Sequence, residues 1–501
     1  MRPTRRQFLG NTVGSGLALG FLSKLAPVSG AEAKLEPGLV KLDDSIEPTV
    51  RLLEQTPRER VLEEVAVRIR SGLTYREVLT ALMLAGVRNV QPRPQVGFKF
   101  HAVLVINSAH LASMSSPAGD RWLPIFWAID RFKSSQLETE KTSGWRMSAV
   151  DEGRVPPADK AKQAFTDAMD NWDEAAADAA AAALARTASR DECFELFARY
   201  GARDFRDIGH KAIYTANSFR TLDAIGWHHA EPVLRSLAYA QLKYDGPVPS
   251  KSDAAPDRPG RRNAERVKAI QPEWRNGKPD AGASRSLLET FRTGSEEEAP
   301  AAVVDALNHG AVADSVWDAI LAAAGELLMR KTNILTLHAV TSANALHYAF
   351  KTTADPESRL MLLLQNAAFL PLFRQGVGEK NLSSQRLDAI EPAPRASDSN
   401  DPLADIFAEA GHDRLSATGK TLAYLQDSHD APSLMHAARR LVFLKGNDAH
   451  DYKFSSAVLE DYFDLSPQWR DRYLAAAMFY LPGSGAPDNA LVQRIRAAFS
   501  A

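Results

Sequence analysis

The sequence contains only one cysteine, Cys193, in 501 residues. A lone cysteine cannot form a disulfide within the chain, and no C-x-x-C or C-x-x-C-H motif is present. No apolar run in the mature chain is long enough to cross a bilayer. Acidic and basic residues nearly cancel, at a net charge of −2, whereas proteins that bind nucleic acid usually carry an excess of positive charge. The sequence therefore predicts a soluble protein with no nucleic-acid partner and no stable membrane span after processing.

Residues 1–33 have the pattern of an export signal. The segment Thr4–Gly10 reads TRRQFLG and leads into a Gly-rich, mildly apolar stretch that ends in AEA, a small-residue cleavage pattern. This resembles a twin-arginine signal, and the alternative is a short amphipathic helix. Four basic residues and one acidic residue lie in the segment, so residues 34–501 would carry a net charge of about −5. We expect the twin-arginine export machinery to deliver this mature chain, already folded, to the periplasm.

The mature chain reads as a single all-α domain. Apolar residues such as Val316 and Ile320 recur at helical spacing almost everywhere, and the period-two alternation of strands is nearly absent. Residues 245–284 and 391–413 interrupt this pattern with proline, glycine and small polar residues. The sequence therefore predicts long surface loops in those two segments.

One ten-residue motif occurs twice. The sequence HAVLVINSAH at 101–110 returns as HAVTSANALH at 338–347, and both fit the frame H-A-V-x-x-x-N-x-x-H. Each copy lies in the middle helix of a predicted trio of helices, and two further trios can be aligned with these. The predicted trios are 74–87, the helix of His101 and 121–132; 191–200, 209–222 and 231–244; 316–329, 334–350 and 357–373; and 432–444, 448–462 and 469–480. The chain is thus predicted to consist of about four quasi-repeated helix trios, although such trios can also be drawn by chance in an all-α protein.

Helix geometry separates the two histidines of each copy. Nine residues at about 100° each amount to a net half turn, so His101 and His110 should face opposite sides of one helix, as should His338 and His347. The leading position is a histidine in all four trios. The candidate metal ligands are therefore His101, His210, His338 and His450. We expect the trailing His110 and His347 to pack or to form hydrogen bonds between helices.

Four imidazoles from four helices could hold one divalent transition metal, because imidazole suits iron, zinc, copper and nickel. Asn107, Asn217 and Asn344 are predicted to support the ligands from behind. Two alternatives stay open at this point: ordinary core histidines satisfied by protein partners, and haem held by paired axial histidines.

Lys453 lies three residues after His450 and hence on nearly the same helix face. An ammonium group cannot bind a cation and is costly to bury beside one. An inward Lys453 would have to be neutral, or be converted by carbon dioxide to a carbamate, which supplies an anionic oxygen ligand. The alternatives are a surface lysine at this position and an inward Lys331, seven residues before His338.

Four short segments carry a family resemblance. They are FHAVLVINSAH (100–110), GHKAIYTANSF (209–219), LHAVTSANAL (337–346) and DAHDYK (448–453). They are similar to the scattered histidine motifs of the questin oxidase-like proteins, in order along most of residues 70–480. The resemblance implies an all-α enzyme that holds non-haem iron through histidines and a modified lysine, and that uses dioxygen to oxidise or open the rings of aromatic polyketides. On this sequence the matching positions are His101, His210, His338, His450 and Lys453.

Two departures from the family pattern are visible. The second motif of the family often has a further histidine where this chain has Ile213 or Tyr214, and its familiar members lack an export signal. The sequence therefore predicts a periplasmic, metal-dependent oxidoreductase with non-haem iron, acting with dioxygen on an aromatic or apolar small molecule. The alternative is a metal-free helical-repeat binding or scaffold protein exported to the same compartment.

Overall fold

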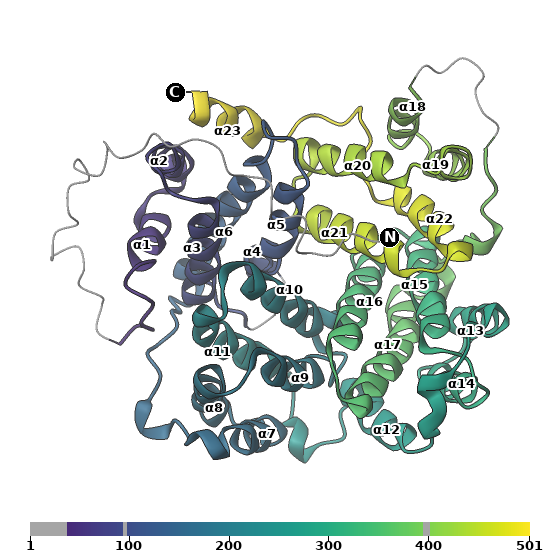
Figure 1. The fold of residues 1–501 in the computed structure, drawn as a ribbon, viewed down its shortest axis with the longest axis horizontal. Helices are drawn as coiled ribbons and strands as arrows, with labels where there is room; N and C mark the ends of the chain where they lie inside the picture. The colour runs from purple at the N-terminus through teal and green to yellow at the C-terminus, as the bar shows by residue number, and fades with distance from the viewer. Residues whose placement is uncertain (1–37, 94–97, 394–400, 501) are drawn as a thin grey trace. The chain divides into compact units, whose positions relative to one another are not determined.

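The computed structural model describes residues 38–93, 98–393 and 401–500, and these residues are almost entirely α-helical (Figure 1). The one β feature among them is an isolated bridge between Lys278 and Ala311. The predicted all-α class is confirmed. Residues Val40–Ala501 form one unit with a continuous apolar core, separate from Met1–Leu39. The predicted export signal, residues 1–33, lies outside the described residues.

The helices follow one another through short connections. In the first half of the chain they are α1 (Glu47–Gln55), α2 (Arg58–Arg70), α3 (Tyr75–Asn89), α4 (His101–Leu104), α5 (Ile106–Met114), α6 (Leu123–Thr142), α7 (Ala161–Asn171), α8 (Glu174–Thr187), α9 (Arg190–Gly201), α10 (His210–Ile225) and α11 (Ala230–Gln241). In the second half they are α12 (Arg258–Val267), α13 (Ala281–Thr293), α14 (Glu298–Asn308), α15 (Ala313–Arg330), α16 (Ile334–Thr352), α17 (Pro356–Val377), α18 (Pro402–Glu409), α19 (Arg414–Ser428), α20 (Ala431–Lys445), α21 (Ala449–Asp464), α22 (Pro467–Ala476) and α23 (Ala490–Ser500).

The predicted trios correspond to α3, α4–α5 and α6; α9 to α11; α15 to α17; and α20 to α22. In each trio the middle helix packs against both of its flanking helices. Local signals fix where the middle helices begin: Asn333 caps α16 and Asp448 caps α21, each in a capping box with the third helical residue. That the four trios arose by internal duplication remains a prediction.

The two predicted long loops are wrong in part, because each contains a helix. Helix α12 lies in the first segment and α18 in the second. Both start with a proline in the first turn, where its missing N–H costs nothing and its fixed φ suits a helix. In α12 the buried residues Pro259, Asn263 and Val267 recur every four positions, which places them on one face. The prolines that seemed to mark loops therefore mark helix starts.

The middle helices of the trios meet in the interior of the Val40–Ala501 unit. Helix α5 contacts α10, α10 contacts α16, α16 contacts α21, and α21 contacts α5, which closes a ring of four helices (Figure 1). The first member is interrupted: the chain turns at Val105 between α4 and α5, so that His101 and His110 lie on separate helical segments. All four leading histidines lie at or near the beginnings of these helices.

Among the described residues, none of the helices combines the length and the apolar character needed to cross a membrane. The single cysteine, Cys193, is buried in α9, and burial raises the pKa of its thiol to about 12. This thiol is therefore an inert core group.

Candidate metal centre

The four leading histidines converge inside the helix ring. His101 opens α4, His210 opens α10, His338 lies in the second turn of α16, and His450 is the second residue of α21. All four are buried, and each offers a ring nitrogen such that the four nitrogens lie within 4.8 Å of one another. The convergence predicted from the sequence is thus present.

The closest contacts in the cluster join Nε2 atoms. His210 Nε2 lies 2.8 Å from His101 Nε2 and 2.8 Å from His338 Nε2. Two nitrogens bound at right angles to one transition-metal ion at ~2.1 Å would lie about 3 Å apart. The spacing of the three imidazoles is therefore close to that of neighbouring ligands on a single ion.

Contacts on the far side of the rings determine which nitrogen points inward. His210 Nδ1 lies 2.6 Å from the backbone oxygen of Asp207, and His338 Nδ1 lies 2.6 Å from that of Ile334. A carbonyl oxygen only accepts hydrogen bonds, so in both rings Nδ1 carries the proton and Nε2 carries the lone pair. His450 Nδ1 makes the corresponding contact with the carboxylate of Asp448.

These assignments leave lone pairs facing each other. With both Nδ1 atoms protonated, the 2.8 Å contact between His210 Nε2 and His338 Nε2 cannot be a hydrogen bond between neutral rings. His450 Nε2 is also buried and has no hydrogen-bond partner among the described residues. An uncompensated set of this kind is repulsive, and a bound cation removes the repulsion. The cluster therefore has the donor chemistry of a metal site.

Protonating the rings is an unfavourable way to relieve this repulsion. Burial lowers the pKa of His101, His210 and His338 well below the ordinary value, and the charge of Lys453 lowers each further. Burial also lowers the pKa of His450, against the opposing effect of its hydrogen bond to Asp448. The imidazoles are thus held neutral, in the form that binds metals.

Lys453 points into the same interior. Its residue is 2% exposed, and its Nζ has no hydrogen-bond partner within the described ranges. Burial lowers the pKa of Lys453 to about 7. A large share of neutral amine is therefore present at pH 7. The rival candidate, Lys331, is exposed at the end of α15, so the surface reading applies to Lys331 and not to Lys453.

Charge balance singles out Lys453 for a second reason. The four imidazoles are neutral, and the carboxylate of Asp448 contacts a ring on its outer side. A divalent ion would therefore keep its full charge in a buried site that also faces the positive ends of several helices. Haem is excluded, since its iron has only two axial positions and four ring nitrogens converge here. An anionic ligand is the missing element of the site.

The trailing histidines lie away from the cluster, as predicted. His110 Nδ1 contacts the Tyr75 hydroxyl at 3.0 Å, and the His347 ring packs against Trp317 with centroids 4.5 Å apart. The predicted supporting role of the asparagines is wrong for two of them. Asn217 donates to the backbone oxygen of Leu104, and Asn344 donates to Glu460 and Asp461.

Sequence reasoning also missed the groups that do support the ligands. Two are backbone carbonyls, which have no sequence signature of their own. The third, Asp448, could have been found, because an aspartate two residues before a histidine at a helix start is a typical N-cap. Its carboxylate accepts a hydrogen bond from the His450 backbone N–H at 2.8 Å as well as contacting the ring.

A second group of potential ligands is His347, Asp461 and Asp464. Its oxygens are already engaged: Asp461 accepts from Asn344 at 2.8 Å and from Tyr473 at 2.9 Å, and Asp464 pairs with Lys351. These partners satisfy the carboxylates without an ion. We therefore interpret this group as a structural polar network between α16 and α21.

A cavity of about 650 Å³ adjoins the helix starts that carry two of the ligands. It is lined by Thr332, just before α16, by Asn447 and Asp451 on either side of His450, and by Tyr480. This volume falls within the range of small-molecule sites.

Comparison with protein-family models, with curated proteins and with solved structures found no match to this chain. The resemblance to questin oxidase-like proteins therefore rests on the four short motifs alone. The buried histidine cluster is established by its geometry and is independent of that resemblance.

Proposed function

We propose that this protein is a metal-dependent oxidoreductase that holds one non-haem iron ion through His101, His210, His338 and His450. Dioxygen and an aromatic or apolar small molecule would be its substrates. The observation that supports the metal is the inward lone pair on three rings whose opposite nitrogens are fixed by hydrogen bonds. The choice of iron and of oxygen chemistry rests on the motif resemblance.

A carbamate on Lys453 would supply the missing negative charge. In this reaction the neutral Nζ attacks carbon dioxide, a new N–C bond forms, and one proton leaves to solvent, giving Nζ–COO⁻. The buried, unpartnered Nζ and its lowered pKa favour this reaction at neutral pH. The carbamate oxygen would then face the cation.

When bound, iron in such a site supplies redox chemistry with dioxygen at coordination positions that the protein leaves open. The described residues would orient the imidazoles, exclude bulk water and balance charge. The neighbouring cavity, with the hydroxyl of Tyr480 at its wall, would admit the small molecule from the side of the helix starts.

Elemental analysis of the purified, exported protein tests the proposal. We expect about one equivalent of iron per chain, and loss of most of it in the double variant His210→Ala plus His338→Ala, because two of the four donors are removed. His110→Ala is the matched control and should keep its metal, since His110 lies outside the cluster. Absence of a stoichiometric transition metal, or full retention by the double variant, would favour a metal-free binding or scaffold protein instead.

A further inference from the structure

The backbone immediately before His210 is left-handed at three successive residues. The φ angles are 53° at Asp207, 47° at Ile208 and 82° at Gly209. Within the described parts of the chain only two other non-glycine residues, Trp172 and His429, have positive φ. A β-branched residue such as isoleucine strongly disfavours this region because its Cβ approaches the carbonyl oxygen. The segment is thus held in a conformation that its own sequence opposes.

This conformation has one direct effect on the metal centre. It turns the backbone oxygen of Asp207 toward His210 Nδ1, which it meets at 2.6 Å. The same turn brings Gly209 against α16, where an added Cβ would lie 2.7 Å from Ser342 Cβ. A relaxed backbone at residues 207 and 208 would move that carbonyl away and free the ring to rotate.

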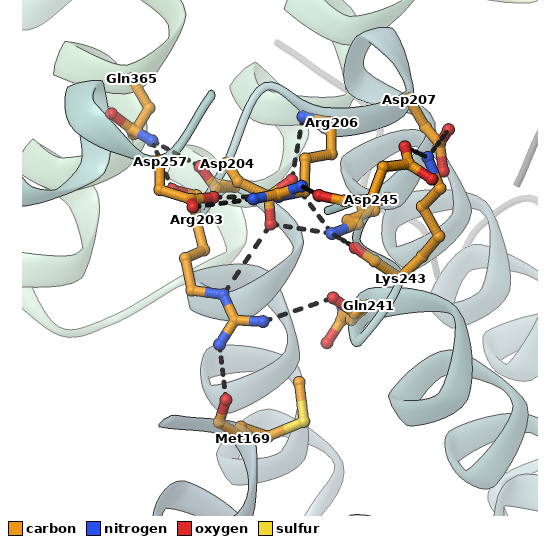
Figure 2. Close-up of polar contacts among 12 residues, drawn as sticks. Met169, Arg203, Asp204, Arg206, Asp207, Gln241, Lys243, Asp245, Asp257 and Gln365 are labelled. Atoms are coloured by element: carbon orange, nitrogen blue, oxygen red, sulfur yellow. Dashed lines mark hydrogen bonds and ion pairs between the residues drawn. The ribbon is translucent and has the colours of Figure 1, made fainter. Parts of the chain in front are cut away.

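Buried ion pairs hold the turn in place (Figure 2). Lys243 Nζ donates to Asp207 Oδ1 at 2.9 Å and to Asp245 Oδ2 at 2.6 Å. Arg206 makes a two-pronged contact with Asp257 at 2.9 and 3.0 Å. Of these pairs, Lys243 with Asp207 is the one that grips the strained residues themselves.

A buried ion pair is a weak source of stability, because the loss of hydration offsets much of the attraction. Its effect here is directional. The carboxylate of Asp207 is pinned by Lys243 on one side of the residue, and the carbonyl of Asp207 is thereby aimed at His210 on the other. Outer groups that orient a ligand histidine typically change metal affinity about 10- to 100-fold when they are removed.

We propose that Lys243 is a positioning residue of the metal centre, which acts through the left-handed turn at 207–208 to fix the orientation and tautomer of His210. This inference rests on the proposed metal site. It adds an element that is distant from the donor atoms and that the motif resemblance does not include.

Metal affinity of the full mature chain tests the proposal, with Co²⁺ and Zn²⁺ as probes in competition with a chelator. Lys243→Met removes the ammonium group and keeps the length of the side chain. We expect its dissociation constants to rise about tenfold or more, together with a change in the visible absorption of bound Co²⁺. Arg235→Met is the matched control. It removes an equally buried cation, which pairs with Asp178 at 2.8 Å, and should change affinity less than about twofold because Arg235 does not touch the turn.

Rescue distinguishes positioning from a general loss of packing. Glycine adopts the left-handed conformation without the penalty of isoleucine. Adding Ile208→Gly to Lys243→Met should therefore recover a substantial part of the lost affinity. If Lys243→Met does not fold, Asp207→Ala removes the same contact from the other partner and should weaken binding in the same way.

The outcomes separate this inference from the proposed function. Unchanged affinity in Lys243→Met, an equal loss in Arg235→Met, or no recovery with Ile208→Gly would overturn the positioning role. Failure of the unmodified protein to bind either probe would overturn the metal site itself.

Discussion

At the scale of single residues, Gly209 offers a sharp measurement of strain. Its φ is 82°, and an added methyl group would lie 2.7 Å from Ser342 Cβ. Gly209→Ala therefore suffers twice, from the left-handed backbone and from the clash. We expect a loss of about 2–4 kcal/mol in the free energy of unfolding, the sum of ~1 kcal/mol for the backbone and ~1–3 kcal/mol for overpacking.

Gly310 is the control for that experiment. Its φ is 92°, and nothing lies within 4 Å of the Cβ position. Gly310→Ala should cost only the backbone term of ~1 kcal/mol. Denaturant unfolding of both variants gives the difference, and equal losses would show that the turn before His210 can move away from α16.

Lys453 carries the second prediction at this scale. Protein prepared under ¹³C-labelled carbon dioxide should give one carbamate carbon signal, because the buried amine is largely neutral near pH 7. Lys453→Met should lack that signal and bind metal more weakly, because the anionic oxygen is gone. Lys331→Met is the control, since Lys331 is exposed. A labelled signal that persists in Lys453→Met would place the modification elsewhere.

At the scale of elements, the contact between α16 and α21 contains a carboxyl group that should titrate far from its usual range. Asp461 is fully buried between Asn344 and Tyr473, and burial raises its pKa to about 8 from 3.8. The folded state therefore retains a proton that the unfolded state releases near pH 4. The stability from this group is complete below about pH 4 and falls as the pH rises toward 8.

Asp461→Asn removes this titration and keeps polar atoms for both partners. Between pH 5 and pH 8 the metal-free wild type should lose stability more steeply than the variant, by up to ~1.4 kcal/mol per pH unit for one proton. Thermal unfolding at several pH values measures the two slopes. Parallel curves would show that Asp461 is ionised in the folded protein.

Elements also show what the sequence could and could not predict. Apolar periodicity located the helices of all four trios, because a helix buried on one side must repeat its apolar residues at helical spacing. It missed the turn at Val105 and the helices α12 and α18. The reason is that prolines at 259 and 402 look the same in a loop and in the first turn of a helix.

The same division holds within the site. Recurrence of a leading histidine was enough to identify four groups that the fold brings together, and their spacing to Lys453 identified a fifth. The strained turn before His210 could not be predicted, because Asp207 and Ile208 are imposed on the left-handed region by contacts with Lys243 and α16 from remote parts of the chain. Local sequence carries no record of such contacts.

At the scale of the whole molecule, the expected export signal remains to be tested. Twin-arginine export depends on the arginine pair, so Arg5→Lys plus Arg6→Lys should keep the chain in the cytoplasm. Fractionation followed by immunodetection measures the distribution. Deletion of residues 1–33 is a second test, and it should leave metal binding unchanged because the cluster lies within Val40–Ala501. Periplasmic accumulation of the lysine variant would contradict the proposed route.

The ring of four helices also sets a schedule for the molecule. Its ligands are spread from His101 to His450, so the four imidazoles can meet only after nearly the whole chain has left the ribosome. At ~5–20 residues per second, the ribosome needs roughly 20–70 s to travel from the first of these codons to the last. During that time the early histidines lack their companions, and a truncated product never acquires the complete set. A filled centre would therefore certify a finished chain.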